Sequence, residues 1–149
     1  MNIKQELFKQ CALFVNNHLD TVEKIISSNQ KALQSETKSS AGDKHETGRA
    51  MLQLEIEKAS QQFKAIQEMK LILAKTDIVN KSKTARLGSI IETSGIRYFL
   101  AISAGKIMAY NKDYFAVSIA SPIGKLLLGK QQGEEVVFNG VTIKISNLL

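Results

Sequence analysis

The spacing of apolar residues changes near the middle of the chain, and this change restricts the fold more than any other feature. Before about residue 76, apolar side chains recur in steps of three and four, the narrow stripe typical of helices paired in a coiled coil. Beyond about residue 86 they form short runs rich in β-branched and aromatic residues, which is typical of strands. The sequence therefore predicts a helical part followed by a small sheet.

The helical part contains two stretches of nearly equal length, residues 2–36 and 44–76, on either side of a short break that includes SSAG. It has no proline and only two glycines, Gly42 and Gly48. Equal lengths and a short connection favour a second helix that folds back along the first. We therefore expect an antiparallel coiled-coil hairpin over residues 1–80, with arms of about 50 Å at 1.5 Å per residue. A self-paired hairpin needs no partner helix, so a monomer is expected.

A polar, lysine-rich linker over residues 75–86 leads to the second predicted domain, residues 84–149. Turn residues separate its strands, and Asn139-Gly140 between two apolar runs is a strong signal for a two-residue hairpin. The other expected turns are Ser94-Gly95, Ala104-Gly105 and Asn111-Lys112-Asp113. The expected core residues are Ile90, Phe99, Ile102, Phe115, Val117, Leu127, Val137 and Ile143.

One short helix interrupts these strands, in the segment SPIGKLLLGK. Ser121 suits its N-cap, Pro122 suits its first position, and Gly129 suits a left-handed stop at its end. The fold class expected is thus α+β: a helical hairpin, then a small sheet with one short helix packed on it.

Charge and composition limit the partners. The net charge of +6 is unevenly spread, with 11 Lys/Arg against 10 Asp/Glu in residues 1–80 and 9 against 4 in residues 81–149. The basic second part makes an anionic partner such as nucleic acid plausible, including DNA. No apolar run approaches the roughly 20 residues that span a bilayer, and the N-terminus does not resemble a signal peptide. We therefore expect a cytoplasmic protein without membrane contact.

Motifs of self-contained catalysis are absent from the sequence, which has neither a phosphate-binding glycine loop nor a serine nucleophile elbow. The single cysteine, Cys11, excludes an internal disulfide. Cys11 and His18 share a helix face, but two ligands without a third make a poor zinc site, so core packing is the expected role of this pair. The protein is not expected to be an enzyme.

Two acids at the break between the helices allow two interpretations. Asp43 is a good N-cap for a helix that begins at Lys44, and Glu46 can reach back to the cap residue's N–H to complete a capping box. Two carboxylates three residues apart also face the same way at a helix start and can share Mg²⁺. Such a pair binds the cation weakly, so a partner would have to supply further ligands.

The stretch GDKHETGRAMLQLEIEKA, residues 42–59, resembles the tip and second helix of the bacterial Gre transcript-cleavage factors (GreA/GreB type). The segment SPIGKLLLGKQQGEEVVF, residues 121–138, resembles the C-terminal signature of that family, S-P-I-G-K-A-L-L-G-K followed by G-D-x-V. The resemblance covers essentially the whole chain. It implies an N-terminal antiparallel coiled coil with an acidic tip near residues 39–48 and an FKBP-like C-terminal domain.

The resemblance also implies a function. In the family, the C-terminal domain docks on RNA polymerase and the coiled coil enters the secondary channel, where the tip stimulates cleavage of backtracked nascent RNA. By position, Asp43 and Glu46 match the tip acids: the first would help hold an Mg²⁺ shared with the polymerase, and the second would orient or activate water. The polymerase supplies the catalytic centre, so no cofactor is expected to bind stably to this chain alone.

Further residues are candidates for contacts. Near the tip, Lys38, Lys44 and Arg49 could contact phosphate of the nascent RNA near its 3′ end, or could simply solvate the arm. In the second domain, the docking candidates are Ser121, Pro122, Ile123, Gly124 and Lys125.

The tip departs from the family pattern, because Thr47 and Gly48 replace the usual Asn-Ala. Glycine there weakens a helical turn by up to about 1 kcal/mol relative to alanine, and His45 adds a titratable group beside the acids. A second hypothesis is therefore a Gre-like regulator or inhibitor that occupies the channel without stimulating cleavage. A third, a peptidyl-prolyl isomerase, is suggested only by the FKBP-like domain, and fold alone does not confer function.

Overall fold

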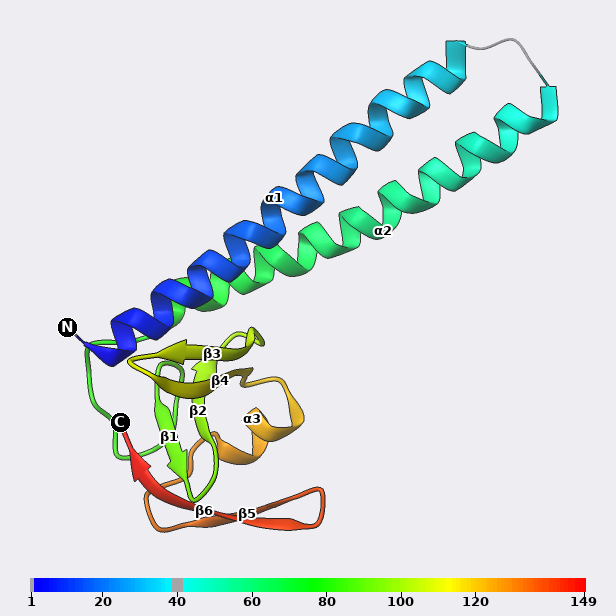
Figure 1. Ribbon diagram of the computed structural model, residues 1–149. Coiled ribbons are helices and arrows are strands. Elements are labelled where there is room, and N and C mark those ends of the chain that lie inside the picture. The colour runs from blue at the N-terminus through cyan, green and yellow to red at the C-terminus, as the bar shows by residue number, and fades with distance from the viewer. Residues whose placement is uncertain (1, 39–41) are drawn as a thin grey trace. The chain divides into compact units, whose positions relative to one another are not determined.

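The computed structural model describes the backbone of residues 2–38 and 42–149 and the side chains of residues 2–35 and 47–149. Within these residues, two long helices precede six strands, and a third, short helix lies between the fourth and fifth strands (Figure 1). This order confirms the predicted fold class. The chain divides into two compact units, one formed by Met1–Phe14 with Lys70–Leu149 and the other by Val15–Met69. The domain boundaries predicted at residues 80 and 84 stay a prediction.

The two long helices, α1 (Ile3–Lys38) and α2 (Gly42–Lys75), run antiparallel (Figure 1). Their ends lie within two residues of those predicted, and each spans about 50 Å at 1.5 Å per residue. Buried side chains recur in steps of three, four and seven residues, as in a coiled-coil seam. They are Lys4, Leu7, Cys11, Val15 and Val22 on α1 and Ala59, Ile66 and Leu73 on α2. Between the helices, Asn29 Nδ2 donates to Glu55 Oε2 at 3.0 Å.

The six strands form one mixed sheet in the order β3-β4-β2-β1-β6-β5. Neighbours are antiparallel except β2 and β4, which pair in parallel. The bounds are β1 Ile90–Thr93, β2 Arg97–Ala101, β3 Gly105–Ala109, β4 Lys112–Ser118, β5 Glu135–Phe138 and β6 Val141–Leu148. At the edge strand β3, Gln10 Nε2 of α1 donates to the carbonyl oxygen of Met108 at 2.5 Å, so a helix side chain satisfies one edge carbonyl.

The main core of the sheet domain lies between the strands and the short helix α3 (Pro122–Leu127). Its members are Ala85, Ile91, Tyr98, Leu100, Ile123, Leu127, Val136 and Ile145. Of the predicted core, Ile90, Phe99, Ile102 and Leu127 are buried, and Phe115, Val117 and Ile143 are partly buried.

Val137 was expected in this core, and that prediction is wrong. It is 61% exposed, whereas its neighbour Val136 is 5% exposed. Successive side chains of a strand point to opposite faces, so a shift of one residue exchanges the buried and exposed sets. Two adjacent valines give no signal that distinguishes the two registers.

The turns follow the predictions with two exceptions. Gly105, expected in a turn with Ala104, is the first residue of β3. Asn139 and Gly140 have φ of 52° and 77° and join β5 to β6 as the expected two-residue hairpin turn. Between β3 and β4 the turn is Tyr110-Asn111, with φ of 50° and 63°, because Ala109 pairs with Lys112. The predicted turn Asn111-Lys112-Asp113 is therefore one residue too late.

Over the part of the chain that the structure describes, no helix is both long enough and apolar enough to cross a lipid bilayer.

Candidate functional site

The predicted acidic tip lies where α1 ends, at Lys38, and α2 begins, at Gly42. The second helix thus begins two residues earlier than expected, and Asp43 lies inside it rather than at the cap position before Lys44. The side chains of Lys38, Asp43, Lys44, His45 and Glu46 lie outside the described residues. The N-cap position predicted for Asp43 is therefore wrong, whereas the predicted contacts of these residues with Mg²⁺ and RNA stay predictions.

Immediately beyond the tip, described side chains resume. Thr47 and Arg49 are exposed, and Gly48 is half-buried, all within α2. The exposed guanidinium of Arg49 is compatible with contact to phosphate and with simple solvation. Both interpretations of this residue therefore stay open.

The segment SPIGK forms the start of α3 through a cap at Ser121. The Oγ of Ser121 accepts a hydrogen bond from Gly124 N at 3.1 Å and donates one to Ser118 O at 2.6 Å. Pro122 occupies the first helical turn, where a missing N–H costs nothing. The predicted cap and first residue of this helix are confirmed, and so is the left-handed Gly129 after its end, with φ of 81°.

The two next residues of the motif face the interior. Ile123 and Gly124 are buried, and a Cβ added to Gly124 would lie 1.9 Å from the carbonyl oxygen of Ser118. This glycine is therefore needed so that α3 can approach the end of β4. Among the docking candidates, Pro122 and Lys125 are exposed, and docking through them stays a prediction.

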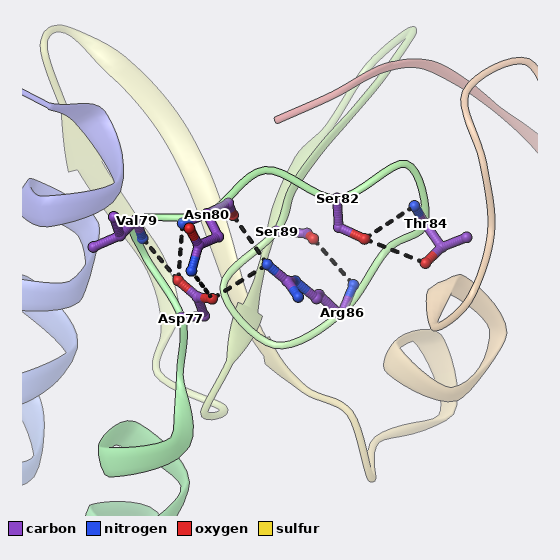
Figure 2. Close-up of polar contacts among 7 residues, drawn as sticks. All are labelled: Asp77, Val79, Asn80, Ser82, Thr84, Arg86 and Ser89. Atoms are coloured by element: carbon purple, nitrogen blue, oxygen red, sulfur yellow. Dashed lines mark hydrogen bonds and ion pairs between the residues drawn. The ribbon is translucent and has the colours of Figure 1, made fainter.

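The segment that the sequence suggested was a plain polar linker contains a hydrogen-bonded turn around Asp77 (Figure 2). One carboxylate oxygen, Oδ1, accepts from the N–H groups of Val79 at 2.9 Å and Asn80 at 3.0 Å. The other accepts from Asn80 Nδ2 at 3.1 Å and from the guanidinium of Arg86 at 3.2 Å. These contacts, chiefly the backbone N–H of Asn80 and then that of Val79, lower the pKa of Asp77 to about 2.

Two further contacts of Arg86 hold the turn together and join it to the residue that precedes β1. Arg86 also donates to the carbonyl oxygen of Asn80 at 3.1 Å, and its backbone N–H donates to Ser89 Oγ at 3.0 Å (Figure 2). Gly88 has φ of 96°, and a Cβ there would lie 1.8 Å from the carbonyl oxygen of Asp77. Aspartate after a helix end signals such a turn, but no sequence spacing indicates its pairing with Arg86.

Two ionisable groups are buried near the start of α1. Lys4 is 8% exposed, and burial lowers its pKa, with the charge of Asp77 acting in the opposite direction. Burial raises the pKa of the Cys11 thiol to about 12. Cys11 is buried, as predicted, but His18 is exposed, so the prediction of core packing is wrong for His18. Within the described residues, no group of three His, Cys, Asp or Glu side chains could hold a metal ion.

Comparisons with known proteins give little further identification. No protein-family model matches the chain, and neither does any curated protein. Among solved structures, the chain is similar to the crystal structure of the GreA factor homolog 1 (Gfh1) protein of Thermus thermophilus, at 19% identity over 91% of this chain and 92% of that one. The TM-score is 0.37. A likeness this weak establishes no shared function.

Proposed function

We propose that this protein is a Gre-type transcription elongation factor that binds RNA polymerase and stimulates cleavage of backtracked nascent RNA. The supporting observation is a combination: GDKHETG forms the start of α2, directly after the end of α1, and SPIGK forms the cap and first turn of the helix that packs on the sheet. In the family, the first motif belongs to the tip of the coiled coil and the second to the C-terminal domain. The positions of the two motifs in this chain are compatible with that arrangement. Fold alone would not carry the proposal, because one architecture hosts many functions.

The residues proposed to act are Asp43 and Glu46, and the catalytic centre would belong to the polymerase. Carboxylate oxygens are the ligands that Mg²⁺ prefers, but two of them leave most of its coordination positions to water or to a partner. The donor set fits a cation shared with the polymerase and not one held by this chain alone. When bound, such a cation would stabilise charge on phosphate oxygens during cleavage. In this proposal Asp43 holds the cation and Glu46 orients water.

A second candidate function is favoured by Thr47 and Gly48. Both lie in the second turn of α2, where the family has Asn-Ala, and glycine lowers helix propensity by about 1 kcal/mol relative to alanine. A loosened tip could occupy the secondary channel without positioning water. The protein would then be a Gre-like regulator or inhibitor that binds polymerase and slows synthesis.

A backtracked elongation complex assembled from the cognate polymerase separates these functions. The parent chain is expected to shorten the 3′ end of labelled RNA, and Asp43→Asn and Glu46→Gln are expected to slow this at least about tenfold, since each removes a negative charge from the reacting centre. The exposed Glu57→Gln, also on α2, is the matched control and should cleave like the parent.

Binding of the chain to the polymerase is measured on the same complexes, and it distinguishes a cleavage factor from a channel regulator. Binding without cleavage by the parent chain would support the channel-regulator function. Cleavage that is equally fast in the parent, Asp43→Asn and Glu46→Gln would show that the acids have no role. A parent chain that does not bind polymerase would remove both candidates.

A further inference from the structure

The sheet domain carries positive charge that its own acids do not offset. Residues 81–149 contain nine Lys/Arg and four Asp/Glu. Asp113 forms an ion pair with Lys106 at 3.2 Å. Glu135 stands opposite Lys144, and Glu92 stands opposite Arg97, on adjacent strands. These three acids therefore lie beside other basic residues than Lys81 and Lys83. In the segment that leads into the domain, Asp77 pairs with Arg86 at 3.2 Å and not with either lysine.

Two of the basic residues, Lys81 and Lys83, line an open groove together with Ser82 and residues of the loop after α3. The groove has a volume of about 580 Å³, and its other lining residues are Gln131, Gln132 and Leu148. Lys81 and Lys83 are exposed, and neither forms an ion pair with any residue that the structure describes. Glu134 is the last residue of this loop before β5 and does not line the groove.

Backbone hydrogen bonds hold the two walls of this groove in place. One wall is the lysine segment, residues 81–85, and the other is the loop after α3, residues 128–134. Ala85 N donates to Lys130 O at 2.8 Å, and Gly129 N donates to Ala85 O at 2.7 Å, so the lysine segment is tied to this loop. Gly133 N donates to Ile145 O at 2.8 Å and ties the same loop to β6. Within the lysine segment, Thr84 N donates to Ser82 Oγ at 3.2 Å (Figure 2). The groove therefore exists before any partner binds, which reduces the ordering cost of binding.

We propose that this groove binds the phosphodiester backbone of a nucleic-acid duplex. Its lining offers ammonium, hydroxyl and carboxamide groups, the side chains that contact phosphate oxygens in protein–DNA interfaces. It lacks an aromatic side chain, and so has no platform for the stacked bases of a single strand. A protein partner would need a buried aromatic or aliphatic anchor, and Leu148 is the one apolar side chain in the lining.

The proposal is independent of the transcription-factor function, because its test contains no polymerase. Binding of the full chain to a labelled 20-base-pair DNA duplex is measured by fluorescence anisotropy between about 50 and 200 mM salt. The variant K81Q/K83Q is expected to bind at least about tenfold more weakly at 50 mM salt and to show a salt slope shallower by about 1.8, since each lost phosphate contact removes about 0.9. K81R/K83R should bind like the parent.

The matched control is K112Q/K144Q, which removes the same charge from exposed positions outside the groove. It should keep the parent's salt slope, and circular dichroism should show all variants folded. Equal weakening by K112Q/K144Q and K81Q/K83Q would overturn the proposal, because the effect would then be one of net charge. Absence of duplex binding at 50 mM salt would also overturn it. Tighter binding of single-stranded RNA or of a polyglutamate peptide than of the duplex would overturn the choice of partner.

Discussion

The carboxylate of Asp77 lies 3.2 Å from the guanidinium of Arg86. It also accepts hydrogen bonds from the backbone N–H groups of Val79 and Asn80 in its own turn. The pairing joins the residue just after α2 to the segment that enters β1. A group whose folded pKa lies below its ordinary value stabilises the native state above that ordinary value. For Asp77 the two values are about 2 and 3.8, so its contribution is present above pH 3.8 and is lost as the pH falls towards 2.

Asp77→Asn is therefore expected to lower the free energy of unfolding at pH 7. The difference between the parent and the variant should shrink as the pH falls below 4. The amide retains the size of the side chain but not the charge that Arg86 and the N–H groups favour. Urea unfolding of the parent and the variant at several pH values between 2 and 7 measures this difference. Glu57→Gln, which removes an exposed carboxylate of α2, is the control for the loss of a surface charge. A difference between parent and Asp77→Asn that is constant across the range would contradict the assignment.

Gly88→Ala is expected to destabilise the sheet domain by about 3 kcal/mol. The residue has φ of 96°, which a side chain rarely adopts, and the new methyl group would meet the carbonyl of Asp77 at 1.8 Å. Gly105→Ala is the matched control, because its φ of 73° imposes the backbone strain but its surroundings are open. That variant should cost about 1 kcal/mol. If urea unfolding shows the same loss of stability for Gly88→Ala and Gly105→Ala, the contact with Asp77 does not contribute to the cost of Gly88→Ala.

Two variants of the SPIGK helix should act through stability rather than through docking. Ser121→Ala removes the cap and is expected to cost about 1 kcal/mol. Gly124→Ala forces a methyl group against the Ser118 carbonyl and should cost about 2 kcal/mol, despite the higher helix propensity of alanine. Lys125→Ala, at an exposed position of the same helix, should stay within about 0.5 kcal/mol of the parent in urea unfolding. Lys125 is thus the suitable position for testing polymerase docking, since its loss would leave α3 intact.

The sequence predicted the helical hairpin, the α+β class, the Ser121 cap and the Asn139-Gly140 turn because each depends on local pattern. Each of these patterns can be recognised in a short stretch of sequence. They are the seven-residue spacing of the helices, the serine before Pro-Ile-Gly, and Asn-Gly between two strands. The spacing of Asp43 and Glu46 predicted a capping box or a pair able to share Mg²⁺. Their role at a polymerase, and docking near SPIGK, came from the family resemblance and stay predictions.

What local pattern does not encode was missed. The Asp77–Arg86 pair joins residues nine apart through a turn, and the groove brings Lys81 and Lys83 beside Gln131 only once α3 and the sheet have packed. The buried position of Gly124 depends in the same way on Ser118, a residue of another element. Contacts of this kind are set by tertiary packing, which a single sequence does not reveal.

The adjacent valines of β5 provide a direct test of strand register. Val136 is almost fully buried and Val137 is mostly exposed, so Val136→Ala is expected to cost about 2 kcal/mol and Val137→Ala less than about 0.5. Val136 belongs to the cluster that includes Leu127 and Ile145, and removing its methyl groups would leave a space that these neighbours fill only in part. The two substitutions remove the same atoms from consecutive positions, so intrinsic strand propensity affects both alike and their difference reports burial. Urea unfolding of both variants measures it. A larger loss for Val137→Ala would mean that β5 pairs with β6 one residue out of the register described here, with Val137 facing α3.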